Sequence, residues 1–255
     1  MTINIILEVP ELRNIKYTFS SKKPLTFQET IEYAKTQGTI LQSAQEAAAF
    51  AIKSETVSAN FIQQLTRTVE VYIKRNNNFY CIIDDIADYE ENIALSRAEE
   101  LSDKLSNDKE FTMPSKDKTI VELIMRAEKS RMFKLQENEL EELSTKEKNR
   151  KSEFGSDRKV IAVLGKFAEQ YASHIRKTWQ EKGFVKKISK TYLESLELED
   201  KALVKVVVIN RGFFGKYNLT YLGKKQGETM SAYARGVKQV CRRNSNKEFV
   251  LKWMK

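Results

Sequence analysis

Hydrophobic residues recur along the chain with two different periods, which predict a mixture of strands and helices. Alternating runs predict strands at residues 2–9 and 15–19, and a three- to four-residue period predicts helices that begin near Thr26 and Ser43. Each of these two residues is followed three positions later by a glutamate, the pattern of a capping box. The same period predicts three further helices, at residues 57–65, 93–105 and 117–131.

A β-hairpin is predicted in the middle of the N-terminal half. Val69–Ile73 alternates as a strand does, three asparagines follow at residues 76–78, and Phe79–Ile83 forms a second apolar run. Asparagine tolerates the backbone angles of tight turns, so we expect the two runs to pair.

A longer amphipathic stretch begins at Asp157 and ends at Gly183. Its apolar residues lie on one helical face: Val160, Val163, Leu164, Phe167, Tyr171, Ala172, Ile175 and Trp179. Its lysines and arginines lie mostly off that face, so the helix has a core side and a cationic side. An ordinary amphipathic helix with a solvated lysine face explains this pattern as well. Strands are predicted next, at residues 184–188, 203–209 and 217–222, and a last helix at residues 228–243.

Charged residues are distributed unevenly along the chain. Residues 1–150 contain 21 Lys and Arg against 25 Asp and Glu, a net charge of −4, whereas residues 151–255 contain 23 against 10, a net charge of +13. Residues 136–156 are dense in charge and poor in bulky apolar side chains, which is typical of a linker. We therefore predict an α+β protein with two domains joined by a linker at residues 136–156. Residues 1–135 would form a body for assembly or regulation, and the basic domain at 157–255 would bind a polyanion.

Two short motifs follow the helix in the basic domain. Trp179 is followed by three polar residues, Gly183 and Phe184-Val185, and Leu219-Thr220-Tyr221-Leu222-Gly223 comes later. With these motifs, residues 157–225 resemble a winged helix-turn-helix DNA-binding domain. The first motif matches the end of that family's recognition helix and its first wing strand, and the second resembles the end of the second wing strand. The resemblance requires a turn at Leu164-Gly165, although one continuous helix fits the sequence equally well.

This resemblance implies binding to nucleic acid, with duplex DNA as the first choice. Residues of the helix would then enter the major groove: Ser173, His174, Arg176, Lys177 and Gln180. Basic residues of the wing and its surroundings would contact phosphates: Lys186, Lys187, Arg211, Lys216, Lys224 and Lys225.

An enzymatic alternative rests on an acidic cluster. Asp84, Asp85 and Asp88 follow an apolar strand, and clustered carboxylates after a strand are suited to Mg²⁺ in a metal-dependent nuclease. Solvated carboxylates after a strand are also common without any metal. The chain has one histidine and two cysteines, too few for a histidine- and cysteine-rich zinc site, and none of the common phosphate-binding or hydrolase motifs occurs.

We thus expect a binding protein rather than an enzyme, and no cofactor. A third interpretation is a structural protein whose basic half binds an acidic protein partner. No apolar run is long enough to span a membrane, which favours a cytoplasmic location, and self-association into a homo-oligomer stays open.

Overall fold

The computed structural model describes residues 5–9, 13–22, 25–53, 63–85, 110–127, 131–136, 140–141, 154–179, 184–185, 188–211, 217–220 and 235–240. Their helices are α1 (Phe27–Thr36), α2 (Ala44–Lys53), α4 (Lys118–Ala127), α5 (Arg158–Leu164), α6 (Phe167–Trp179) and α7 (Lys190–Ser195), with a 3₁₀ turn, η2, at Phe154–Ser156. Their strands are β1 (Ile5–Val9), β2 (Arg13–Ser20), β3 (Ile40–Leu41), β4 (Gln63–Arg75), β5 (Asn78–Asp85), β6 (Glu110–Pro114), β7 (Met132–Lys134), β8 (Leu140–Glu141), β9 (Phe184–Val185), β10 (Ile188–Ser189), β11 (Lys201–Arg211), β12 (Tyr217–Thr220) and β13 (Arg235–Val240). The predicted mixture of helices and strands is confirmed.

The predicted hairpin is the pair β4–β5. Its strands run antiparallel from Thr68 opposite Asp85 to Arg75 opposite Asn78. The turn residues Asn76 and Asn77 have φ of 48° and 60°, values that asparagine tolerates better than most residues. The capping boxes at the starts of α1 and α2 are confirmed as well.

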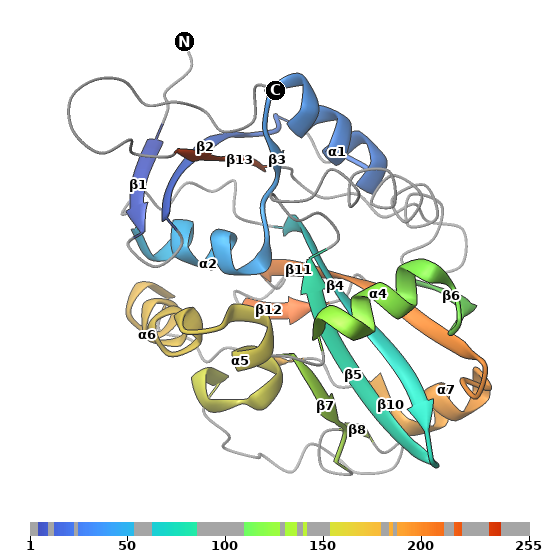
Figure 1. The fold of residues 1–255 in the computed structure, drawn as a ribbon. Helices are drawn as coiled ribbons and strands as arrows, with labels where there is room; N and C mark the ends of the chain where they lie inside the picture. The colour runs from blue at the N-terminus through green and yellow to red at the C-terminus, as the bar shows by residue number, and fades with distance from the viewer. Residues whose placement is uncertain are drawn as a thin grey trace.

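The larger sheet contains seven strands within the described part of the chain, in the order β7-β5-β4-β11-β12-β9, with β6 also paired to β11 (Figure 1). β11 pairs with β4 along one edge. Its other edge pairs first with β6 and then with β12. This strand from the C-terminal half is therefore central to a sheet that begins in the N-terminal half.

The pairing of β11 with β4 corrects the predicted division into two domains. One hydrophobic cluster contains Ala48 and Tyr72 from the N-terminal half together with Ile175 and Leu203 from the C-terminal half. The expected linker is not wholly unstructured either, because β8 lies within it, pairs with β10 and buries Leu140. The two halves share one sheet and one core.

In a smaller sheet, strand β13 from the C-terminal part of the chain pairs with strands from the N-terminal part. Its order among the described strands is β1-β2-β13-β3, and β13 runs antiparallel to both of its neighbours. The predicted helix at 228–243 is therefore wrong for Arg235–Val240, and its remaining residues lie outside the described part. Figure 1 shows this sheet at one end of the molecule, with α2 between it and the α5–α6 pair.

The helices cover both faces of the larger sheet. α2, α5 and α6 contribute to a cluster with Tyr72 on one face, whereas α4 contributes to a cluster with Val69, Val71 and Ile73 on the other. Neighbouring side chains of a strand point to opposite faces, which is why β4 supplies both clusters.

The segment that resembles a winged helix in sequence has a strand arrangement that differs from that of a winged-helix domain. Two helices are present, because α5 ends at Leu164, the following Gly165 has φ of 56°, and α6 begins at Phe167. The single continuous helix is therefore wrong. However, β9 pairs with β12 in parallel, whereas the two strands of a wing hairpin run antiparallel. The predicted wing is therefore not formed by these strands.

The three other predicted helices have different outcomes. Residues 63–65 of the helix predicted at 57–65 belong to β4, and its earlier residues lie outside the described part, as does the whole of 93–105. α4 confirms the helix expected within 117–131. Within the described ranges, no helix is long and apolar enough to span a membrane.

Candidate functional site

The cationic face of α6 is exposed, as the sequence predicts. The opposite face of the helix is buried in the core through Phe167, Tyr171 and Ile175. Arg176 and Lys177 are exposed in the last turn, and no described side chain forms an ion pair with either of them. Cations at this end also favour the helix, because the last carbonyl groups carry partial negative charge.

Ser173 and His174 lie half-buried one turn before these cations. Burial lowers the pKa of His174 below its ordinary value of 6.5, so the imidazole is mostly neutral at pH 7. At neutral pH, the positive charge of this face therefore comes from Arg176 and Lys177.

The other predicted nucleic-acid contacts are not placed. Gln180, Lys186, Lys187, Lys216, Lys224 and Lys225 lie outside the described residues, and Arg211 ends β11 with a side chain that is not described. The structure thus brings together four of the predicted residues on α6: Ser173, His174, Arg176 and Lys177.

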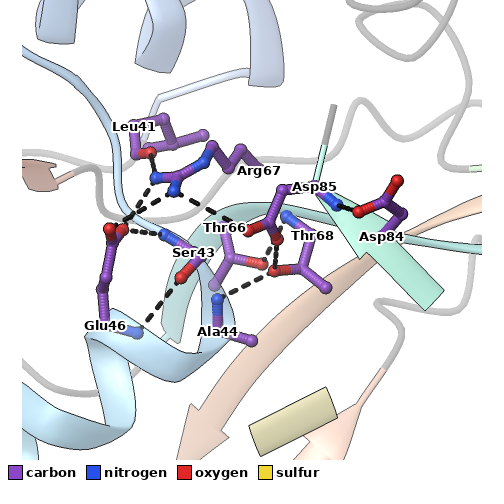
Figure 2. Close-up of polar contacts among 9 residues, drawn as sticks. All are labelled: Leu41, Ser43, Ala44, Glu46, Thr66, Arg67, Thr68, Asp84 and Asp85. Atoms are coloured by element: carbon purple, nitrogen blue, oxygen red, sulfur yellow. Dashed lines mark hydrogen bonds and ion pairs between the residues drawn. The ribbon is translucent and has the colours of Figure 1, made fainter. Parts of the chain in front are cut away.

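The acidic cluster lies in a different environment from the one expected of a metal site. Figure 2 shows Asp85 facing Arg67 and Thr68 at the end of β5. The Thr68 hydroxyl donates to Asp85 Oδ1 at 2.6 Å, and Arg67 Nη2 lies 3.7 Å from Asp85 Oδ2. Asp84 Oδ1 accepts from the backbone N–H of Asp85 at 2.8 Å.

Arg67 is the centre of this polar network, and only 5% of it is exposed. Its Nη1 lies 2.7 Å from Glu46 Oε2 and donates to the Leu41 carbonyl at 2.6 Å. Glu46 also accepts from the backbone N–H of Ser43, so one carboxylate both caps α2 and neutralises the guanidinium (Figure 2). A buried charge is tolerated when it is paired and hydrogen-bonded in this way.

An irregularity in β4 creates the network. Val206 is opposite Val69 and Val208 is opposite Leu65, so three residues of β4 face Val207 alone. The Thr66 hydroxyl donates to the Val207 carbonyl at 2.6 Å, and the Arg67 N–H donates to the Gln42 carbonyl at 2.9 Å. A bulge redirects side chains locally, and here Arg67 reaches α2 and β3 instead of joining the regular ladder.

These contacts give Asp85 a structural role. One of its carboxylate oxygens accepts from Thr68 and the other faces Arg67, whose positive charge would disfavour a nearby cation. No group of metal-ligating side chains is found in the described ranges, and Asp88 lies outside them. The nuclease alternative has no support in this arrangement.

A second buried network was not predicted from the sequence. Lys159 Nζ of α5 lies 3.1 Å from Glu70 Oε2 and 3.1 Å from the Tyr72 hydroxyl, which itself donates to Glu70. Burial raises the pKa of Glu70, and the Lys159 ammonium opposes that shift. Burial and the Glu70 charge raise the pKa of Tyr72 well above 10. The network joins β4 of the N-terminal half to α5 of the C-terminal half.

The sequence contained a weak signal for both networks. Thr68 and Glu70 alternate with Val69 and Val71 along β4, a pattern typical of a strand with one solvated face. However, Thr68 and Glu70 are each only 1% exposed. The alternation and the helices were predictable from the sequence, but the packing of α2 and α5 on this face of β4 was not.

No protein-family model and no curated protein sequence matches the chain. One solved structure is similar in fold and is described as "Accommodation of massive sequence variation in Nanoarchaeota by the C-type lectin fold". The match covers 88% of this chain and 97% of the other, with a TM-score of 0.56 and 13% sequence identity. The likeness is one of fold. It spans the predicted domain boundary, in agreement with the shared sheet.

Proposed function

We propose that this chain is a non-catalytic binding protein on a fold similar to the C-type lectin fold, and that the α6 face binds nucleic acid. The observation that carries the proposal is a contrast between two kinds of charged residue. Glu70 and Arg67 form ion pairs inside the molecule, and half-buried Asp85 faces Arg67. In contrast, Arg176 and Lys177 are exposed and form no ion pair with a described residue.

Charge supports a polyanion as the ligand. The net charge of +13 on residues 151–255 would attract phosphates, and exposed cations that release counterions supply much of the affinity of such complexes. Duplex DNA is our first choice of ligand, since a helix that presents Arg, Lys and Ser can contact both phosphates and base edges.

The similar structure is relevant to this proposal only through its fold. The work on that protein describes the accommodation of massive sequence variation by the C-type lectin fold. We propose that the present chain keeps its two buried networks for stability and uses the exposed face of α6 for binding.

The test is a titration of a fluorescent DNA duplex with the full chain across a salt series. If about five phosphates are neutralised, log K should fall with log salt concentration at a slope near −4 to −5. The absence of binding at low salt would contradict the proposal and would favour an acidic protein partner instead.

A further inference from the structure

A groove on the other side of the larger sheet is independent of the proposed function. It has a volume of about 400 Å³ and is lined by the end of β4, the turn that leads into α4, α4 itself and the turn before β11. The backbone N–H of Ser115 donates to the Asp200 carbonyl at 2.8 Å, which joins two of these walls. A volume of this size is within the range of small-molecule sites.

Exposed apolar side chains are concentrated along the groove. Ile73 and Ile124 line it and are nearly buried, whereas Val121 and Met125 are 38% and 63% exposed. Val121 and Met125 are one turn apart on α4 and therefore lie side by side. In the described part of the chain, Ile161 is the one other large hydrophobic residue with comparable exposure, at 47%, and it belongs to α5 on the opposite face of the sheet. Exposed apolar residues that gather in a concave site are typical of ligand binding.

The charges around the groove favour an anion. Lys74, Arg75 and Lys116 line it together with Glu199 and Asp200, so positive charge exceeds negative charge by one. Lys74 and Glu199 form an ion pair and neutralise each other. Lys116 is exposed and forms no ion pair with a described residue.

We propose that this groove binds a small amphipathic carboxylate. Its aliphatic or aromatic part would lie against Val121, Ile124 and Met125, and its carboxylate would face Lys116. Methionine suits such a site because its flexible, polarisable side chain adapts to ligands of different shape.

The test uses sodium octanoate, below the concentration at which it forms micelles, and full-length protein labelled with ¹³C at the methionine methyl groups. Octanoate should shift the Met125 signal saturably, and octylammonium, with the same tail and the opposite charge, should bind about fivefold more weakly, as expected for one partly screened charge pair. The absence of a saturable shift, or equal binding of the two compounds, would overturn the proposal.

Two matched substitutions locate the site. Val121→Ser should weaken octanoate binding about tenfold because it removes apolar contact, whereas Ile161→Ser should leave binding unchanged. Valine, isoleucine and serine have similar helix propensities, and both replaced side chains are exposed, so both variants should keep the parent's melting temperature within a few degrees. An equal loss of binding in both variants would place the ligand elsewhere and overturn the proposal.

Discussion

At the scale of single residues, the burial of Glu70 gives the stability of the protein a defined dependence on pH, which the Lys159 ammonium limits. The pKa of Glu70 is raised in the folded state, so the folded chain holds this proton more tightly than the unfolded chain. The unfolding free energy contributed by Glu70 therefore falls as the pH rises from the ordinary value of 4.5 through the folded pKa.

Lys159→Met should increase this dependence. Without the ammonium, burial acts on Glu70 with less opposition and raises its pKa further. We therefore expect the free energy of unfolding to fall by about 3–5 kcal/mol at pH 8 and by less at pH 5. Urea unfolding at the two pH values measures the difference, and Glu70→Gln combined with Lys159→Met should abolish it. An equal loss at both pH values in the single variant would show that the pair does not control the charge of Glu70.

Some features of single residues were predictable from the sequence, whereas others were not. The exposure of Arg176 and Lys177 was predictable because it depends on helical period alone. The burial of Glu70 and Arg67 was not, since it depends on α5 and α2, which are distant in sequence and cover β4 only in the folded chain. Asp84 and Asp85 at the end of β5 were recognised as an acidic pair, but the contact of Asp85 with Arg67 was not predicted.

At the scale of elements, Gly165 separates α5 from α6. Its φ of 56° and ψ of −138° belong to a region that residues with a Cβ rarely adopt. A Cβ built at this position would also approach the Gln45 side chain to 3.0 Å.

Gly165→Ala should therefore destabilise the protein by about 1–3 kcal/mol, most of it from the backbone. Thermal melting beside the parent measures the loss, and Ala162→Ser, within α5, serves as a control that leaves the break between the helices unchanged. If Gly165→Ala melts at the same temperature as the parent, the turn between α5 and α6 tolerates a side chain at this position and the prediction is wrong.

The strands show the limits of local patterns. The β4–β5 hairpin was predictable because its turn and both of its strands are adjacent in sequence. The local residue period predicted a helix at 228–243, although Arg235–Val240 forms β13. Pairing on both edges, with β2 and β3, overrides that local pattern, and neither partner is near it in sequence.

At the scale of the whole molecule, the shared sheet predicts how the chain behaves after cleavage between its halves. The charge-rich stretch at 136–156 contains many lysines and glutamates, and we expect trypsin to cut there first. Because β11 is paired along β4 and the two halves share a core, the fragments should elute together in gel filtration and separate only in denaturant. Fragments that separate under native conditions would restore the two-domain interpretation.

The most direct test of the central claim compares two double variants in the DNA titration. Arg176→Ala with Lys177→Ala removes two cations from the last turn of α6, whereas Lys22→Ala with Lys35→Ala removes two exposed cations from the N-terminal part, one of them in the last turn of α1. Net charge changes equally in both, and alanine is a good helix former, so both should fold as the parent does. If α6 contacts the phosphates, the first variant should bind more weakly, with a salt slope smaller by up to about two, and the second should bind as the parent does. Equal binding by the two variants at every salt concentration would contradict the account.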